Sequence, residues 1–167
     1  MKKKILYLFS DTGGGHRASA TAIMKAVEHI KGKEVHQEMA DVFAECSGFL
    51  NIFAKLYAPV IKYVPKFWGM LWYWLDDLEK LQNLEKLARP FIRRELEDLL
   101  IEKEPNVVVS VHPMINHLTI RAMKDTGYKV PMITVTTDPV TFHRVWVCEE
   151  VDALVVANEI ALARAVE

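Results

Sequence analysis

The chain has 167 residues, of which 51% are hydrophobic, and its formal net charge at pH 7 is -1. This length is enough to bury the core of one domain, and the composition is unlike that of a disordered chain. The balanced charge also argues against a generic nucleic-acid binder, so we expect no nucleic-acid partner.

The N-terminal residues and the cysteines favour a cytoplasmic location. Only five uninterrupted apolar residues, 5–9, follow the basic start of the chain, which is too short for the apolar region of a signal peptide. Cys46 and Cys148 lie far apart and match no zinc or disulfide pattern, as is usual in a reducing compartment.

Apolar and β-branched runs bounded by turn residues predict strands at about 4–9, 34–39, 107–111, 132–136 and 153–156. Helical patterns lie between most of them: residues 18–27 predict a first helix that ends near Gly32, and residues 115–124 predict a later one that ends near Gly127. Strands that alternate with helices imply crossover connections and parallel pairing. We therefore predict an α/β fold, a Rossmann-like and doubly wound sheet that is mostly parallel.

Residues 42–104 interrupt this alternation between the second and third strands. Leucines recur at helical spacing in their later half, from Leu81 to Leu99, and Pro90 is expected to divide that half into two helices. We interpret the whole stretch as a helical insertion, and we expect its leucines to pack on the sheet.

The first half of the insertion, residues 49–75, is rich in aromatic residues. Nine of its residues are aromatic, and its only charges are Lys55, Lys62 and Lys66. No stretch in it reaches the roughly 18 apolar residues that a bilayer span requires. Aromatic rings with lysines nearby are typical of an element that lies on an anionic membrane surface. A core helix, or a cap against a second domain, would use many of the same residues, and this alternative stays open.

Gly13, Gly14 and Gly15 stand between the first strand and the first helix. Such a turn places backbone N–H groups and the positive end of the helix dipole at the carboxyl edge of the sheet. This is a site for negative charge or for the close approach of a substrate.

Two known motifs have this shape. The phosphate loop of nucleotide hydrolases needs a Lys-Ser or Lys-Thr pair after its last glycine, whereas His16 and Arg17 follow here, so that motif is excluded. The dinucleotide fingerprint G-x-G-x-x-A is matched at 13–18, with Glu38 or Asp41 available to meet a ribose. A dinucleotide-binding domain therefore stays open.

His16 begins the first helix directly after the glycines. The helix dipole disfavours the protonated imidazole at that end. A neutral imidazole can take a proton from a substrate hydroxyl near neutral pH, which suits a general base. A helix cap or an ordinary surface residue is the alternative role.

Three motifs carry a resemblance to a known family. They are Ser-Asp-Thr-Gly-Gly-Gly-His-Arg-Ala-Ser-Ala at 10–20, Val-Ser-Val-His-Pro at 109–113 with His117 after it, and Thr-Val-Thr-Thr-Asp at 134–138 with His143 and Trp146 after it. Over essentially its whole length the chain resembles the N-terminal domain of the monogalactosyldiacylglycerol synthases and processive diacylglycerol glucosyltransferases. These enzymes are relatives of the peptidoglycan glycosyltransferase that makes lipid II.

The resemblance implies a membrane-associated glycosyltransferase of the GT-B type. Its N-terminal domain would bind the acceptor, diacylglycerol, and its C-terminal domain would bind a UDP-sugar. Transfer would proceed with inversion and give a β-glycolipid, with no obligatory metal and no cofactor. Because the enzymes of this family are longer, we expect residues 1–167 to be the acceptor domain alone, without the nucleotide-sugar domain and inactive by itself.

The resemblance also implies roles for single residues. His16 matches the general base, and Asp138 would orient it or another polar group, although a turn cap before Pro139 is the alternative for Asp138. The backbone of Gly13, Gly14 and Gly15, together with His112 and His143, would bind the acceptor or the phosphates, while Trp146 is expected in the core. A metal site made of His112, His117, His143 and Cys148 has no recognised ligand spacing.

A lipid acceptor favours the membrane interpretation of residues 49–75. The predicted docking residues are Lys55, Lys62, Lys66, Phe67, Trp68, Trp72 and Trp74. The protein would then be peripheral on the inner face of the cell membrane. A lipid-binding module without catalysis is a further alternative.

Overall fold

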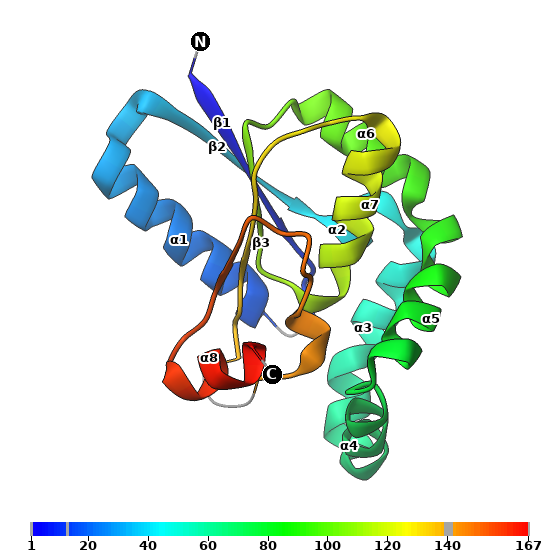
Figure 1. The fold of residues 1–167 in the computed structure, drawn as a ribbon. Helices are drawn as coiled ribbons and strands as arrows, with labels where there is room; N and C mark the ends of the chain where they lie inside the picture. The colour runs from blue at the N-terminus through cyan, green and yellow to red at the C-terminus, as the bar shows by residue number, and fades with distance from the viewer. Residues whose placement is uncertain (1, 13, 139–141, 167) are drawn as a thin grey trace.

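The computed structural model describes residues 2–12, 14–138 and 142–166 (Figure 1). Within these residues, five parallel strands form one sheet in the order β2-β1-β3-β4-β5. The strands are β1 (Lys3–Phe9), β2 (Val35–Asp41), β3 (Val107–Ser110), β4 (Met132–Val135) and β5 (Ala153–Val155). The predicted doubly wound α/β fold is confirmed. The strand order reverses between β1 and β3, and ligands of such sheets bind at the carboxyl ends of the strands at that point.

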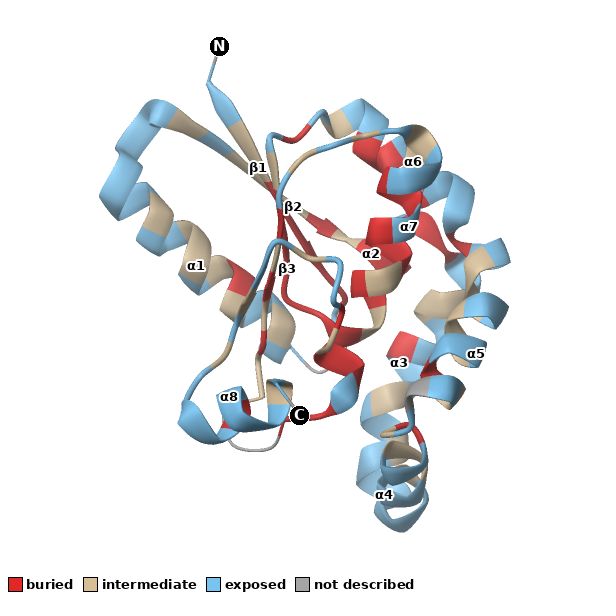
Figure 2. Cartoon of the chain, viewed as in Figure 1, coloured by how far each residue is buried: buried red, intermediate tan, exposed pale blue. Residues whose placement is uncertain are grey.

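Helices cover both faces of the sheet because its strands are apolar on both sides. Helix α1 (Gly15–Lys31) lies on one face, and helices α6 (Arg93–Lys103) and α7 (Asn116–Thr126) lie on the other (Figures 1 and 2). Side chains alternate along β1: Tyr7 and Phe9 belong to the core cluster of α1, whereas Leu6 and Leu8 belong to the cluster of α6 and α7. The sheet is thus the middle of three layers.

The predicted helical insertion is present between β2 and β3. It consists of α2 (Val42–Cys46), α3 (Gly48–Tyr63), α4 (Pro65–Trp74), α5 (Leu78–Ala88), the 3-10 turn η2 (Arg89–Phe91) and α6. The side chains of Asp41, Ser47 and Asp77 accept hydrogen bonds at the starts of α2, α3 and α5. Pro90 lies in η2 and separates two helices, as predicted. Helix α4 projects beyond the rest of the molecule (Figure 1).

The remaining elements are short: η1 (Gly32–Glu34), η3 (Pro113–Ile115), η4 (Arg144–Trp146) and α8 (Glu159–Ala165). Helix α1 starts at Gly15, earlier than the predicted residue 18. The reason is local, because the amide of Ala18 already donates to the carbonyl of Gly14 at 3.1 Å. The glycine motif itself therefore forms the first helical turn.

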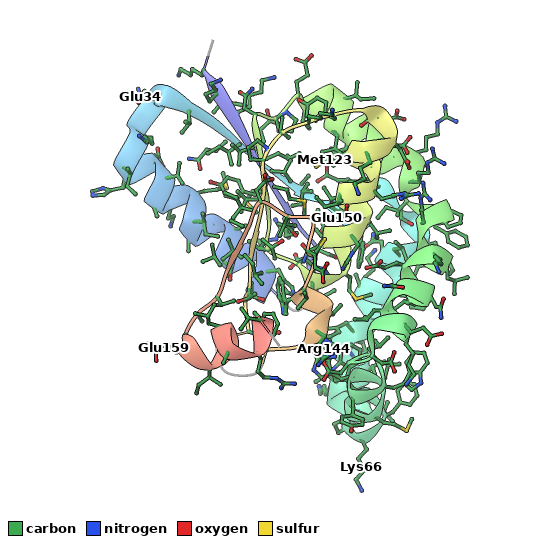
Figure 3. The ribbon with its side chains drawn as sticks, viewed as in Figure 1. Glu34, Lys66, Met123, Arg144, Glu150 and Glu159 are labelled. Atoms are coloured by element: carbon green, nitrogen blue, oxygen red, sulfur yellow. The ribbon has the colours of Figure 1, made fainter. Side chains whose placement is uncertain are left out.

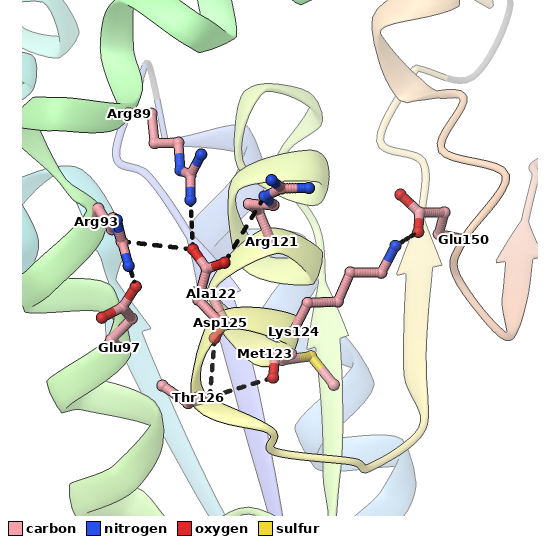
Figure 4. Close-up of polar contacts among 10 residues, drawn as sticks. All are labelled: Arg89, Arg93, Glu97, Arg121, Ala122, Met123, Lys124, Asp125, Thr126 and Glu150. Atoms are coloured by element: carbon pink, nitrogen blue, oxygen red, sulfur yellow. Dashed lines mark hydrogen bonds and ion pairs between the residues drawn. The ribbon is translucent and has the colours of Figure 1, made fainter.

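Ion pairs tie the insertion to the second half of the chain. Asp125 of α7 accepts from Arg89 of η2 and also lies near Arg93 and Arg121 (Figure 4). Lys124 of α7 forms a further pair with Glu150. The pairs of Asp125 with Arg89 and Arg93 join α7 to η2 and α6, but such solvent-accessible pairs contribute little free energy each.

Candidate functional site

The glycine turn ends at the start of α1, at the carboxyl end of β1. Gly14 has a φ of 83°, a left-handed conformation that favours glycine, and no side chain caps α1. Asp11 and Arg17 pair across the turn at 3.1 Å. Gly13, predicted as part of this site, lies outside the described residues. The first N–H groups of α1 are therefore left for a ligand or for water.

His16 links the loops that follow three strands. Its Nδ1 lies 2.7 Å from the carbonyl oxygen of Val111, after β3, and 3.2 Å from the hydroxyl of Thr137, after β4. A carbonyl can only accept, so Nδ1 carries the hydrogen and the lone pair of the neutral ring is on Nε2. Within the described part of the chain, Nε2 has no hydrogen-bond partner. The ring is held in the tautomer that a general base requires.

The pKa of His16 is lowered from its ordinary value. Burial is the main cause, and it outweighs the hydrogen bond to Val111 and the charges of Asp138 and Asp11, which act in the opposite direction. The direction agrees with the sequence-based expectation, although the expectation named the helix dipole as the cause. At neutral pH the imidazole is mostly unprotonated.

His112 packs directly against His16, with 4.4 Å between the ring centroids. It is buried, its Nδ1 accepts from the amide of Met114, and its Nε2 lies 3.2 Å from the hydroxyl of Thr12 in the glycine turn. Burial holds the pKa of His112 well below its usual value, and the nearby His16 lowers it further. His112 is thus a neutral ring that connects η3 to the glycine turn.

The negative charge of Asp138 acts on His16, but the hydrogen bond of Asp138 is with a different residue. Its Oδ2 accepts a hydrogen bond of 2.6 Å from Nε1 of Trp146, whose fully buried ring lies 6.2 Å from the ring of His16. No hydrogen bond joins Asp138 to His16 among the described residues. Orientation of His16 therefore comes from Val111 and Thr137, whereas Asp138 acts on it through its charge.

His143 is buried and joins the segment after β4 to the insertion. Its Nε2 donates to the carbonyl of Trp72 at 2.9 Å, and its Nδ1 accepts from the amide of Val145. The rings of His143 and Trp72 lie 4.0 Å apart. Asp76, just beyond α4, accepts from the amide of Arg144. The end of α4 is thus fixed to the segment that carries Trp146.

The predicted docking residues divide into two groups. Trp68 and Trp72 are half-buried and pack on each other at 5.9 Å between centroids. Phe67, Trp74 and the three lysines are exposed, and Lys66 projects from the outer end of α4 (Figure 3).

Exposed large apolar residues cover α3 and α4. We call them the α3–α4 apolar surface: Phe49, Ile52, Phe53, Leu56, Ile61, Tyr63, Val64, Phe67, Met70, Tyr73 and Trp74. This number of exposed apolar residues on two consecutive helices favours an interaction site. Among the helices of the described residues, none combines the length and the apolar character that crossing a bilayer requires.

The carboxylates that a bound dinucleotide would need are engaged elsewhere. Glu38 pairs with His36 and Lys103. Asp41 caps α2 through Ala44 and accepts from the amide of Asp11. This arrangement does not favour the dinucleotide alternative.

Two further features lie outside the candidate site. In residues 2–12, 14–138 and 142–166, no three His, Cys, Asp or Glu side chains are grouped so that they could hold a metal ion. A groove of about 490 Å³, lined by residues such as Met123 and Tyr128, lies where β4 and β5 begin. That is the opposite edge of the sheet from His16.

Sequence reasoning missed Val111 and Thr137 as partners of His16. The carbonyl of Val111 leaves no signal in a sequence, because every residue has one. Thr137 could have been found, since it is a polar residue directly after a predicted strand, in the loop that carries Asp138.

Comparisons with known proteins identify the family of the chain. Residues 16–167 match the family model described as monogalactosyldiacylglycerol (MGDG) synthase. The chain is 34% identical over 147 residues to a probable monogalactosyldiacylglycerol synthase of Glycine max, which covers 86% of the chain and 28% of the relative. It is 35% identical over 147 residues to monogalactosyldiacylglycerol synthase 3 of Arabidopsis thaliana, with coverages of 86% and 31%. The chain thus spans less than a third of these relatives.

The relatives correct one expectation. Their names describe them as chloroplastic, so the predicted position on the inner face of the cell membrane is wrong. That prediction relied on a short apolar run and unpaired cysteines. Both features argue against secretion, but neither distinguishes the cytoplasm from an organelle.

Proposed function

Because the chain belongs to the monogalactosyldiacylglycerol synthase family, we propose that it is the N-terminal, acceptor-binding domain of a glycosyltransferase that makes a glycolipid from diacylglycerol. The donor is a UDP-sugar, and the names of the relatives favour a galactosyl group. The chain spans less than a third of its relatives, so we propose that binding of the UDP-sugar, and with it sugar transfer, requires further residues of the complete enzyme.

The observation that carries the proposal is the hydrogen bond from His16 to Val111. It leaves the lone pair of Nε2 on a neutral ring in the loop region at the switch point of the sheet. Nε2 takes the proton of the acceptor hydroxyl while the hydroxyl oxygen bonds to the anomeric carbon of the sugar. The bond from that carbon to the phosphate oxygen breaks, and its electron pair leaves with UDP. Attack from the face opposite UDP gives inversion and a β-glycolipid.

The surroundings of His16 suit the charge that this step creates. The imidazolium formed is attracted by Asp138 and Asp11 and keeps its hydrogen bond to Val111. Trp146 holds Asp138 in place through the 2.6 Å bond to Oδ2. Asp138 therefore stabilises the product state of the proton transfer.

The start of α1 suits the negative charge of a UDP-sugar. Gly15 has an ordinary backbone conformation, and a Cβ placed on it meets nothing within 4 Å. Packing in the described structure therefore does not require a glycine there. Close approach of a phosphate or of the transferred sugar to the backbone N–H would require one.

The α3–α4 apolar surface supports docking on a membrane that contains the acceptor. Its aromatic residues suit the headgroup boundary, and Lys55, Lys62 and Lys66 supply attraction to anionic lipid. The lysines are the only charged residues between Gly48 and Trp74. An anionic lipid surface is thus the partner that this part of the chain fits best.

A sugar-transfer assay with the complete enzyme tests the proposal, with diacylglycerol in vesicles and UDP-galactose as substrates. His16→Ala should lower kcat by about 10²- to 10⁴-fold, the usual contribution of a general base. His29→Ala is the matched control, because His29 lies exposed in the last turn of the same helix. Full activity in His16→Ala would refute the role of His16. Vesicle binding with no transfer from any UDP-sugar would favour a lipid-binding module.

A further inference from the structure

Tyr57 belongs to α3, one of the two helices that carry the α3–α4 apolar surface. It is half-buried in α3, and its ring stands edge-on to Trp68 with 4.9 Å between the centroids. Trp68 packs on Trp72, and Trp72 packs on His143. His143 begins the segment that ends in Trp146, the residue that holds Asp138. A continuous row of rings therefore leads from Tyr57 to residues 143–146.

The hydroxyl of Tyr57 has no hydrogen-bond partner in the described part of the chain. The other tyrosines that are not exposed are both paired: Tyr7 donates to Gln37 at 2.7 Å and Tyr128 donates to the carbonyl of Pro105 at 2.9 Å. The hydroxyl is not one of the buried polar atoms that lack a partner, so solvent reaches it. It is therefore a donor that is open to a ligand as well as to water.

The negative charge of Asp138 acts on the hydroxyl of Tyr57. Burial, and then the negative charge of Asp138, raise the pKa of Tyr57, so the phenol keeps its proton and acts as a donor. Asp138 uses Oδ2 for Trp146, which leaves Oδ1 as an acceptor. A donor, an acceptor and a row of aromatic rings thus lie in one region.

We propose that Tyr57 is an acceptor-binding residue whose hydroxyl donates a hydrogen bond to an ester carbonyl of diacylglycerol. This inference rests on the proposed function. A glycerol diester with one free hydroxyl carries a carbonyl oxygen and a hydroxyl close together, followed by two acyl chains. The carbonyl binds Tyr57, the hydroxyl faces His16, and the chains run outward along the α3–α4 apolar surface. Tyr57 would then select for an esterified glycerol and not merely for an apolar molecule.

The test compares Tyr57→Phe with Tyr128→Phe in the 167-residue chain. Both variants lose one hydroxyl, but Tyr128 donates to the carbonyl of Pro105 at the opposite edge of the sheet from His16. Association is measured with vesicles of phosphatidylcholine and phosphatidylglycerol, with and without dioleoylglycerol. Tyr57→Phe should weaken the dioleoylglycerol-dependent part of binding by about fivefold, which corresponds to roughly 1 kcal/mol. Binding without dioleoylglycerol, and binding by Tyr128→Phe, should not change.

Each other result has a distinct meaning. If dioleoylglycerol strengthens binding of the unaltered chain and Tyr57→Phe behaves like Tyr128→Phe, the role of Tyr57 is refuted while the proposed function stands. If dioleoylglycerol has no effect on the unaltered chain, both are refuted. Thermal unfolding should give the same midpoint for Tyr57→Phe and the unaltered chain, because the ring on Trp68 is retained.

Discussion

The Nδ1 atom of His16 donates to the carbonyl oxygen of Val111 across 2.7 Å, and this bond joins the start of α1 to the end of β3. A backbone carbonyl cannot become a donor, so the bond fixes the tautomer whatever substrate is present. The tautomer of the ring is therefore determined by the strand order, which places β1 beside β3.

The first prediction concerns the titration of His16. Its pKa should lie below 6.5, because burial disfavours the protonated ring. Sugar transfer needs the neutral ring, so activity should fall only as the pH drops through that lowered pKa and should be constant above neutrality. Nitrogen-15 NMR of the imidazole should show a proton on Nδ1 and none on Nε2 at pH 7.5. A proton on Nε2 would exclude the proposed base.

The second prediction separates two neighbouring glycines. Gly15→Ala should leave the free energy of unfolding unchanged or raise it by up to about 1 kcal/mol, because alanine favours helix and the added methyl meets no atom. It should raise KM for the UDP-sugar at least about tenfold, the loss expected for hydrogen bonds to a charged group. Gly14→Ala should instead destabilise the fold by about 1–2 kcal/mol, because Gly14 has a positive φ. An unchanged KM in Gly15→Ala would show that the glycines are not part of the donor site.

The third prediction concerns His117, which joins α7 to the residues after η4. A hydrogen bond with Cys148 raises its pKa to about 9, and the nearby Glu85 carboxylate and the carbonyl of Val147 contribute in the same direction. The folded state thus binds a proton more tightly than the unfolded chain, whose histidine pKa is about 6.5. This stabilisation is complete below pH 6.5 and is lost as the pH rises through about 9.

Unfolding by urea between pH 6 and pH 10 tests this contribution of His117 to stability. The free energy of unfolding should fall over this range by roughly 1 kcal/mol, a figure reduced for solvent screening because the side chain is partly exposed. His117→Gln should remove the slope, and the exposed His29→Gln should retain it. The same slope in His117→Gln would assign the effect to another group.

The fold was largely predictable from sequence, because its signals are local. Apolar runs such as 107–111 identified the strands, and Gly32, Gly127 and Pro90 marked helix ends as they do in the structure. His16 could also be predicted as a site residue, since glycines and a polar residue after a strand define the edge where ligands bind.

The partners in the site were less predictable, since they depend on packing between distant segments. Trp68 and Phe67 are adjacent in sequence and equally apolar, yet one packs on Trp72 and the other faces solvent. The inward face of α4 is the one that contacts His143, which lies 71 residues after Trp72 in the chain. Composition could identify an aromatic helix pair but could not divide its residues between packing and docking.

The fourth prediction follows from the division of the aromatic residues into packed and exposed ones. Replacing Phe67, Tyr73 and Trp74 together with alanine should abolish co-sedimentation with anionic vesicles, because these exposed rings supply the apolar contact with lipid. The free energy of unfolding should change by less than about 0.5 kcal/mol per residue, as is usual for surface positions.

Trp68→Ala is the control with the opposite pattern. It removes a ring that packs between Tyr57 and Trp72, so it should lower the free energy of unfolding by about 1–3 kcal/mol, while the folded fraction still binds vesicles. Replacing Lys55, Lys62 and Lys66 with glutamine should weaken binding to anionic vesicles only, by about 1 kcal/mol for each lysine close to the surface. If the triple aromatic variant still sediments with vesicles, the α3–α4 apolar surface faces another protein domain and the lipid must enter elsewhere.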